Sequence, residues 1–284
     1  MLNGIILGLI AMFSFGIIEI ALKKVSERLG THTTILYRGL FVVITLLLFS
    51  ILFQQPVILS PEVILWMILT SFFGIIAFFS FVYALKIGKV SVISPVAHGS
   101  AAVTVLLAVL FYKEVLSTFQ AFGIILVILG TLFVSFKWKE LKNLNLQEIT
   151  KGLPYALLTL FTWGITFFLY KISVNKAGAF TPALLIDGMT FLGMLAAVPF
   201  VKKVAHPSKK DWWLLAFIGL FSGIAILCLS YGFTKEFISV VTPIVYASPF
   251  VTVILARIFL KETLEINQYL GIMGIIVGVV LLAF

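Results

Sequence analysis

The sequence has few charged residues and almost no cysteine. Asp, Glu, Lys and Arg make up 11% of the 284 residues, whereas a soluble domain contains about 25%. The hydrophobic share is 62% and the mean hydropathy is +1.20. Such a chain cannot cover its own surface with polar groups, so the composition predicts an integral membrane protein. The single cysteine, Cys228, excludes an internal disulfide and any cysteine-based metal framework.

Catalytic and metal-binding motifs are also missing. Of three histidines, only His98 falls within an apolar segment. The sequence contains no HExxH, CxxC, GxSxG or phosphate-binding loop, and no acidic cluster that could hold a metal. These absences argue against an enzyme, and we expect neither a cofactor nor a metal site. Lys and Arg lie in short runs between apolar segments, so the net charge of +9 indicates contact with anionic lipid and not with nucleic acid.

Apolar segments about 20 residues long, the length needed to cross a bilayer, recur along the whole chain. The first has neither a basic leader nor a cleavage site, so we interpret it as a retained span. Only 137–151 and 202–211 are longer polar connections, which makes neighbouring spans antiparallel. We therefore predict an all-α, multi-pass protein of a prokaryotic cell membrane with ten spans, near 2–22, 33–53, 63–85, 90–111, 117–136, 152–170, 181–201, 212–233, 238–259 and 265–283.

The second half of the chain repeats the first. With an offset of 148 residues, 18 of the 40 positions in 91–130 are identical to those in 239–278, without a gap. We predict a first five-helix repeat at 1–136, a connecting loop at 137–151 and a second repeat at 152–284. Because five is odd, the two copies must cross the bilayer in opposite directions. An inverted repeat of this kind is typical of transporters, whose binding site lies near the bilayer midplane between the copies.

The repeated segments resemble a known family. The stretches that carry the resemblance are YALKIGKVSVISPVAHGSAAVTVLLAVLFYKEVLSTFQAFGIILVILG and SVVTPIVYASPFVTVILARIFLKETLEINQYLGIMGIIVGVVLL. Each has a proline in the fourth span, an apolar run ending in FYKE or FLKE, and a glycine-spaced fifth span. They are similar to the two EamA repeats of the drug/metabolite transporter superfamily. The resemblance implies ten helices around a central cavity, no bound cofactor, and a substrate among amino acids, sugars, drugs or other metabolites.

Polar residues inside the fourth and ninth spans are the first candidates for the binding site. His98 and Tyr246 occupy equivalent positions, and an ionisable residue within a membrane span suggests a functional role. A neutral histidine bonded to a neighbouring helix is the alternative. The resemblance places Trp163, which precedes the first-span glycine of its repeat, at the cavity wall. The full set of predicted substrate-binding residues is His98, Tyr246, Trp163, Tyr83, Tyr231, Ser94, Ser100 and Ser248.

Two prolines and four charged residues complete the candidates. Pro95 and Pro243 each remove a backbone hydrogen-bond donor, which predicts either a hinge or a kink needed for packing. We expect two ion pairs at opposite faces, one between Glu19 and Arg38 and the other between Lys171 and Asp187, because an unpaired charge in hydrocarbon is costly. These pairs act either as gates or as static clamps. Gly123, Gly130, Gly271, Gly274 and Gly278 allow close helix packing, within a monomer or across a homodimer.

The function predicted from these features is alternating-access transport of a small, partly apolar metabolite, in the direction of export. A proton-coupled antiporter is the first alternative, because histidine titrates near neutral pH. A membrane scaffold or membrane-embedded enzyme is the second. Partners are the solute and the bilayer. Connections after odd-numbered spans hold 14 Lys and Arg and those after even-numbered spans hold 4, which predicts termini on the outer side, whereas the resemblance favours cytoplasmic termini.

Overall fold

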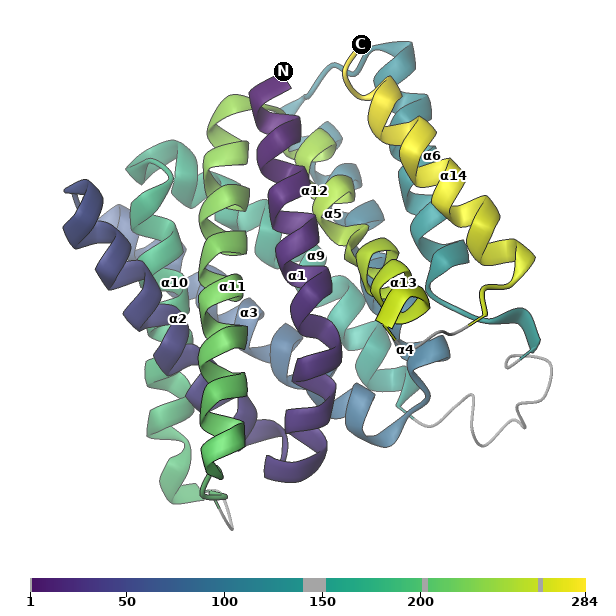
Figure 1. Cartoon of the computed structure of the whole chain (residues 1–284). Helices are drawn as coiled ribbons and strands as arrows, with labels where there is room; N and C mark the ends of the chain where they lie inside the picture. Colours follow the sequence, from purple (N-terminus) through teal and green to yellow (C-terminus); the bar gives the residue numbers. More distant parts are fainter. Residues whose placement is uncertain (1, 140–151, 201–203, 260–262) are drawn as a thin grey trace.

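The computed structural model describes residues 2–139, 152–200, 204–259 and 263–284. Every regular element in this part of the chain is helical. Both termini lie at the same end of the bundle (Figure 1), as an even number of spans requires. The elements are α1 Leu2–Leu29, α2 Thr31–Phe53, α3 Pro61–Ile87, α4 Val90–His98, α5 Ser100–Leu107, the π-helix η1 Ala108–Tyr112, α6 Thr118–Val134, α9 Leu153–Ala177, α10 Phe180–Ala196, the 3-10 turn η2 Val198–Phe200, α11 Lys209–Lys235, α12 Ile238–Tyr246, α13 Ser248–Phe259 and α14 Ile266–Leu281.

These helices confirm the predicted all-α membrane fold, with the fourth and ninth spans each divided in two. In the described residues, eight segments are long and apolar enough to cross a bilayer, and α6 and α14 are shorter apolar helices. Some spans are longer than predicted, and α1 continues to Leu29. In this extension, an i,i+4 ion pair of 3.9 Å joins Lys23 to Glu27. Most of the predicted connecting loop, 140–151, lies outside the described residues.

Corresponding helices of the two repeats also have equivalent N-terminal caps. Ser60 caps α3 by accepting a hydrogen bond from the backbone N–H of Val63, and Ser208, 148 residues later, caps α11 in the same way. The fifth spans begin with capping boxes whose first residues, Ser117 and Glu265, have the same offset. The two copies therefore begin corresponding helices with the same local chemistry.

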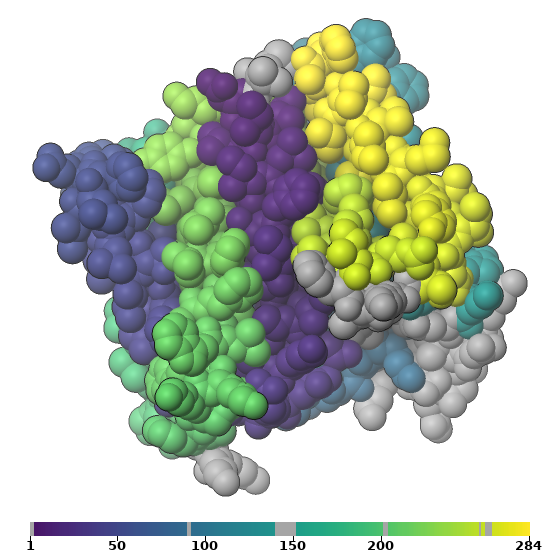
Figure 2. All heavy atoms as spheres, in the orientation of Figure 1, coloured from purple at the N-terminus to yellow at the C-terminus, as the bar shows by residue number. Residues whose placement is uncertain are grey.

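Helices pack mainly across the two repeats. The first helix of each copy lies against the third helix of the other, so that α1 packs on α11 and α3 packs on α9. On the face shown in Figure 2, α1 is placed between α11 and α13. The second helices, α2 and α10, also contact one another, as do the fifth, α6 and α14. Exchanging the two copies converts the contact of α1 with α11 into that of α9 with α3, and it leaves the other two contacts unchanged. The bundle therefore has an approximate internal twofold axis.

The glycines of the fifth spans serve packing within the monomer. A Cβ atom on Gly130 would lie 2.7 Å from the carbonyl oxygen of Gly271, and one on Gly271 would lie 2.6 Å from that of Gly130. Gly123 and Gly278 make the same reciprocal approach at 2.8 Å. Because side chains at these positions would collide with backbone, glycine is what allows α6 and α14 to touch.

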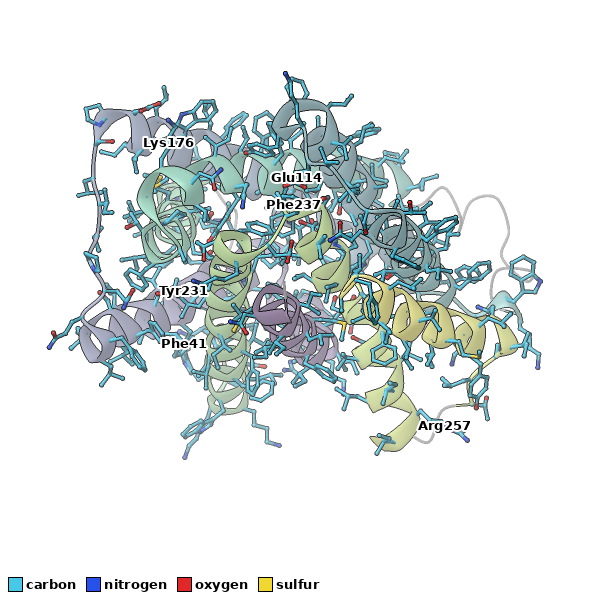
Figure 3. All side chains as sticks on the ribbon, turned by 90° about the horizontal axis from the view of Figure 1, so that it is seen from above. Phe41, Glu114, Lys176, Tyr231, Phe237 and Arg257 are labelled. Carbon is cyan, nitrogen blue, oxygen red and sulfur yellow. The ribbon has the colours of Figure 1, made fainter. Side chains whose placement is uncertain are left out.

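A carboxylate from the first repeat caps a helix of the second. Glu114 accepts hydrogen bonds from the backbone N–H groups of Ile238 at 3.0 Å and Ser239 at 3.1 Å, and also from the Ser239 hydroxyl. Figure 3 shows Glu114 beside Phe237, the residue that precedes α12. A negative charge at a helix N-terminus satisfies otherwise unpaired donors and complements the helix dipole. This contact ties the connection between η1 and α6 of the first repeat to the start of α12.

Candidate functional site

The fourth span of each repeat is broken at the same place. α4 ends at His98 and α5 starts at Ser100, while α12 ends at Tyr246 and α13 starts at Ser248. The residues between them, Gly99 and Ala247, are separated by the repeat offset of 148. Pro95 and Pro243 lie inside α4 and α12, and the break comes four residues after each proline. The predicted hinge role of these prolines stays a prediction.

Two glycines let the broken spans approach the first helix of the opposite repeat. A Cβ atom on Gly16 of α1 would lie 2.5 Å from the Cβ of Val251 in α13. The equivalent atom on Gly164 of α9 would lie 2.5 Å from the Cβ of Val103 in α5. Because no larger residue fits, these glycines fix the breaks next to Phe15 and Trp163, the residues that precede them.

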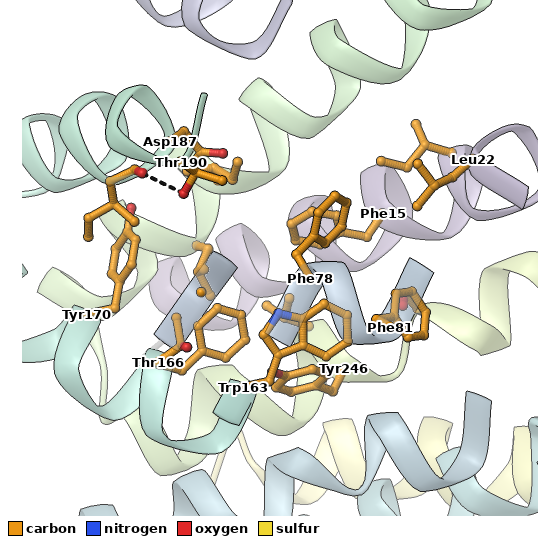
Figure 4. Close-up of a pocket in the computed structure, with 18 of the residues that line it drawn as sticks. Phe15, Leu22, Phe78, Phe81, Trp163, Thr166, Tyr170, Asp187, Thr190 and Tyr246 are labelled. Carbon is orange, nitrogen blue, oxygen red and sulfur yellow. Dashed lines mark hydrogen bonds between the residues drawn. The ribbon is translucent and has the colours of Figure 1, made fainter. Parts of the chain in front are cut away.

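A cavity of about 170 Å³ lies between the two repeats, beside the breaks. Figure 4 shows Trp163 and Tyr246 between Phe78 and Phe81 on one side and Thr166 and Tyr170 on the other. The lining residues are all buried or half-buried. The lining consists of Phe15, Ile18, Glu19, Leu22, Arg38, Gly74, Phe78, Phe81, His98, Trp163, Thr166, Phe167, Tyr170, Ile186, Asp187, Thr190, Ile226, Leu229, Val245, Tyr246 and Ser248.

Aromatic rings form a continuous part of the wall. The ring centroid of Trp163 is 4.8 Å from that of Phe81 and 6.0 Å from that of Tyr246. Tyr246 also lies 5.1 Å from Phe167 and 6.0 Å from His98, again between centroids. These separations fall within the range of favourable aromatic contacts, which run from about 4.5 to 7 Å. The cluster gives the cavity a rigid apolar surface.

His98 is held by hydrogen bonds on both ring nitrogens. Its Nδ1 lies 2.8 Å from the carbonyl oxygen of Ser94, and its Nε2 lies 3.4 Å from the Ser248 hydroxyl. A carbonyl oxygen can only accept, so Nδ1 carries the proton and donates to Ser94. The Ser248 hydroxyl can both donate and accept, so it is a partner for Nε2 in either protonation state of the ring. This arrangement gives both ring nitrogens a partner and links the breaks of the two repeats.

The charged residues pair differently from the prediction. Arg38 and Asp187 form an ion pair across the repeats, with 3.7 Å between Nη1 and Oδ1. The predicted pairs, Glu19 with Arg38 and Lys171 with Asp187, are wrong because α2 packs directly on α10 and brings the charges of the two second helices together. Lys171 instead donates to the carbonyl oxygen of Phe233.

Two further contacts hold the Arg38 side chain. Its Nε donates to the Ser222 hydroxyl at 3.1 Å, and its guanidinium carbon lies 4.6 Å from the centre of the Phe78 ring. Glu19 is the other charged residue in the wall, and it accepts a hydrogen bond of 2.9 Å from the Thr252 hydroxyl. The cavity thus contains one compensated ion pair and one separate carboxylate.

The structure brings together half of the predicted substrate-binding residues. His98, Tyr246, Trp163 and Ser248 line the cavity, whereas Ser94 and Ser100 are buried outside its lining. Tyr83 and Tyr231 lie away from it because each is four residues from the end of its helix. The Tyr83 ring contacts Tyr155 at 4.8 Å between centroids, and the Tyr231 hydroxyl donates to Gln55 at 2.7 Å.

Sequence reasoning missed several wall residues, among them Phe78, Phe81, Phe167 and Tyr170. The signal that could have found them is the repeat itself. Eight pairs of lining residues are related by the offset of 148, as Phe15 is to Trp163. The other seven pairs are Ile18 with Thr166, Glu19 with Phe167, Leu22 with Tyr170, Arg38 with Ile186, Phe78 with Ile226, Phe81 with Leu229 and His98 with Tyr246.

The threonine hydroxyls contribute little free hydrogen-bonding capacity to the wall. Thr166 donates to the carbonyl oxygen of Thr162 at 2.7 Å, and Thr190 donates to that of Ile186 at 2.8 Å, the contact dashed in Figure 4. Among the described residues, no group of three or more His, Cys, Asp or Glu side chains could hold a metal ion. The hydroxyls of Tyr170 and Tyr246 have no hydrogen-bond partner among the described residues. Recognition of a polar solute therefore depends on these two hydroxyls and on the charged side chains.

Known proteins share this architecture. The chain matches the EamA-like transporter family over residues 2–136 and again over 150–284. An uncharacterized transporter of Helicobacter pylori is 25% identical, over 99% of this chain and 95% of its own. An uncharacterized transporter of Bacillus subtilis is 27% identical over 68% of this chain and 61% of its own length.

Two further matches add to this result. An uncharacterized protein of Methanocaldococcus jannaschii is 28% identical over 47% of this chain and 96% of its own. A solved crystal structure superposes with a TM-score of 0.77 at 16% identity, covering 98% of this chain and 95% of that one, which shows the fold alone. Together with the two inverted copies and the cavity between them, the match over both halves shows that this chain belongs to the EamA-like transporter family.

Proposed function

We propose that the protein transports a small, partly apolar metabolite, such as an amino acid, across a prokaryotic cell membrane in the direction of export. The observation that carries this proposal is the paired lining of the cavity. Residues at equivalent positions of two oppositely inserted copies meet in one cavity, which is the arrangement needed for a site that opens alternately to the two sides. The named relatives from two bacteria support a transport role and a prokaryotic setting.

The size of the cavity limits the solute. An engineered protein cavity of about 150 Å³ admits benzene, and this cavity measures about 170 Å³. A solute with a single ring, or one as large as an amino acid, is therefore the expected cargo. The aromatic wall around Trp163 and Tyr246 provides apolar contact for such a molecule.

Filling the cavity tests the proposal. Gly74 lines it, and a Cβ atom there would meet only Thr166, at 3.6 Å. Gly74→Leu should therefore insert a side chain into the cavity without displacing backbone. Gly188→Leu is the matched control, because Gly188 lies outside the lining and a Cβ atom there meets nothing within 4 Å.

The assay is flux of labelled solutes into proteoliposomes, after a thermal-shift screen of amino acids and small metabolites has identified a ligand. We expect at least a tenfold loss of flux in Gly74→Leu and normal flux in Gly188→Leu, with both variants folded. Absence of saturable flux with every ligand that binds would favour the scaffold or enzyme alternative instead.

A proton-coupled antiporter is the second candidate, and the position of His98 at the junction of the two breaks favours it. His98→Asn retains hydrogen-bonding capacity but cannot carry a proton near neutral pH. If protons are exchanged through His98, flux in this variant loses its dependence on the pH gradient while the solute is still bound. Unchanged dependence on the gradient removes this candidate.

A further inference from the structure

The charges in the cavity wall do not balance. Among the described residues, the Asp, Glu, Lys and Arg side chains of the lining are Glu19, Arg38 and Asp187. Their formal charges sum to −1, which favours a cationic solute over an anionic one.

The positive charge already has a carboxylate partner. Arg38 is bound by the carboxylate of Asp187, the hydroxyl of Ser222 and the ring face of Phe78, which come from three different helices. The guanidinium is also buried, with 8% of the side chain exposed. A solute anion at the guanidinium would have to share it with the Asp187 carboxylate, and two negative charges placed close together in an apolar setting are unfavourable.

The carboxylate of Glu19 is the one without a counter-charge. Its hydrogen-bond partner is Thr252, a neutral hydroxyl, and Glu19 makes no ion pair within the part of the chain that the structure describes. Phe15 and Leu22 are four and three residues from it on the same face of α1, and both line the cavity, so the carboxylate lies between apolar side chains. A charge in such surroundings is stabilised by an opposite charge brought by the solute.

The opposite wall also suits a cation. The position equivalent to Glu19 in the second repeat is Phe167, so a carboxylate on one side of the internal axis corresponds to an aromatic ring on the other. Trp163 and Tyr246 extend this aromatic surface. Ammonium groups are attracted electrostatically to the faces of such rings. Phe78 already binds the Arg38 guanidinium in this way.

We propose that the cavity selects solutes carrying a protonated amine on a compact apolar or aromatic body, with Glu19 as the counter-ion of the amine. The inference rests on the proposed transport site and narrows its substrate class. The aromatic cluster binds the body of the solute, and the Arg38–Asp187 pair disfavours anions. A zwitterion is accepted through its amine, whereas the corresponding acid without an amine is rejected.

Three probes of nearly equal size and different charge test this inference. They are phenethylamine, 2-phenylethanol and 3-phenylpropionate, and their binding to the full-length protein in lipid nanodiscs is measured by calorimetry, with empty nanodiscs as the baseline. We expect phenethylamine to bind at least tenfold more tightly than the alcohol, and the carboxylate to bind more weakly than the alcohol. Equal affinities, tighter binding of the carboxylate, or no binding of the amine would overturn the proposal.

Charge-neutral variants assign the effect to Glu19. Glu19→Gln should lower the affinity for phenethylamine at least tenfold and leave that for 2-phenylethanol unchanged. The matched control is Glu62→Gln, because Glu62 pairs with Lys176 at 2.6 Å outside the cavity lining. The same loss in both variants would show a general surface-charge effect and sink the assignment.

This outcome is independent of the transport proposal. If phenethylamine binds through Glu19 but no solute crosses the membrane, transport fails and the cation site stands. If other solutes are transported while the amine does not bind, the transport proposal stands and the cation site fails.

Discussion

Replacing Asp187 by leucine should destabilise the protein by leaving the Arg38 charge buried without its partner. The two side chains are 14% and 8% exposed. Removal of one member of a buried ion pair costs about 3–5 kcal/mol. The contact is a single one of 3.7 Å, and Ser222 and Phe78 still hold the guanidinium afterwards. We therefore expect a loss at the low end of that range, about 3 kcal/mol.

The double variant Arg38→Met with Asp187→Leu separates the ion pair from simple loss of packing. Replacing both charges by apolar groups of similar volume removes the desolvation cost of each, so the double variant should lie within about 1 kcal/mol of the unaltered protein. The difference between the double variant and the sum of the single ones gives the coupling between the two side chains.

The assay is equilibrium unfolding in mixed micelles, followed by tryptophan fluorescence. The reasoning is refuted if Asp187→Leu alone changes the free energy of unfolding by less than about 0.5 kcal/mol, the usual range for surface substitutions. It is also refuted if the double variant is less stable than Asp187→Leu. The transport rate of the folded double variant then distinguishes the two roles of the pair, because a clamp is needed for stability alone and a gate for turnover.

Three further predictions concern packing, capping and orientation. Gly130→Ala should cost about 1–3 kcal/mol of stability, because its Cβ would lie 2.7 Å from the Gly271 carbonyl oxygen. Gly188→Ala should not destabilise the protein, because a Cβ atom there meets nothing within 4 Å. Equal effects of the two variants on the unfolding midpoint would contradict this packing role. Glu114→Ala removes the acceptor for two backbone donors of α12 and should lower the free energy of unfolding by about 1–3 kcal/mol, while Glu114→Gln restores part of it; an unchanged unfolding curve for the alanine variant argues against the cap. The distribution of Lys and Arg predicts termini on the outer side. In a Cys228→Ser background, Val115→Cys should therefore react with a membrane-impermeant maleimide added outside intact cells, and Lys210→Cys should not. The reverse pattern places the termini in the cytoplasm.

The features that the sequence determined are those set by single segments and by their repetition. A chain with so few charges and apolar runs of bilayer length can only satisfy its backbone as helices in lipid. The offset of 148 residues, read from the sequence, fixes the inverted arrangement because each copy has an odd number of spans. It also gives the equivalence of His98 and Tyr246, and both line the cavity. These inferences need no knowledge of which helices touch.

The tertiary structure decided everything that depends on contacts between helices. Arg38 pairs with Asp187 and not with Glu19, because the second helices of the two copies meet at the internal axis and a charge at low dielectric is held by whichever partner packing brings closest. Tyr231 has the residue type expected of a cavity wall, yet its place near the end of α11 directs its hydroxyl to Gln55. Within the described residues, the carboxylate of Glu19 has no counter-ion for the same reason, because the packing of α2 against α10 pairs Arg38 with Asp187.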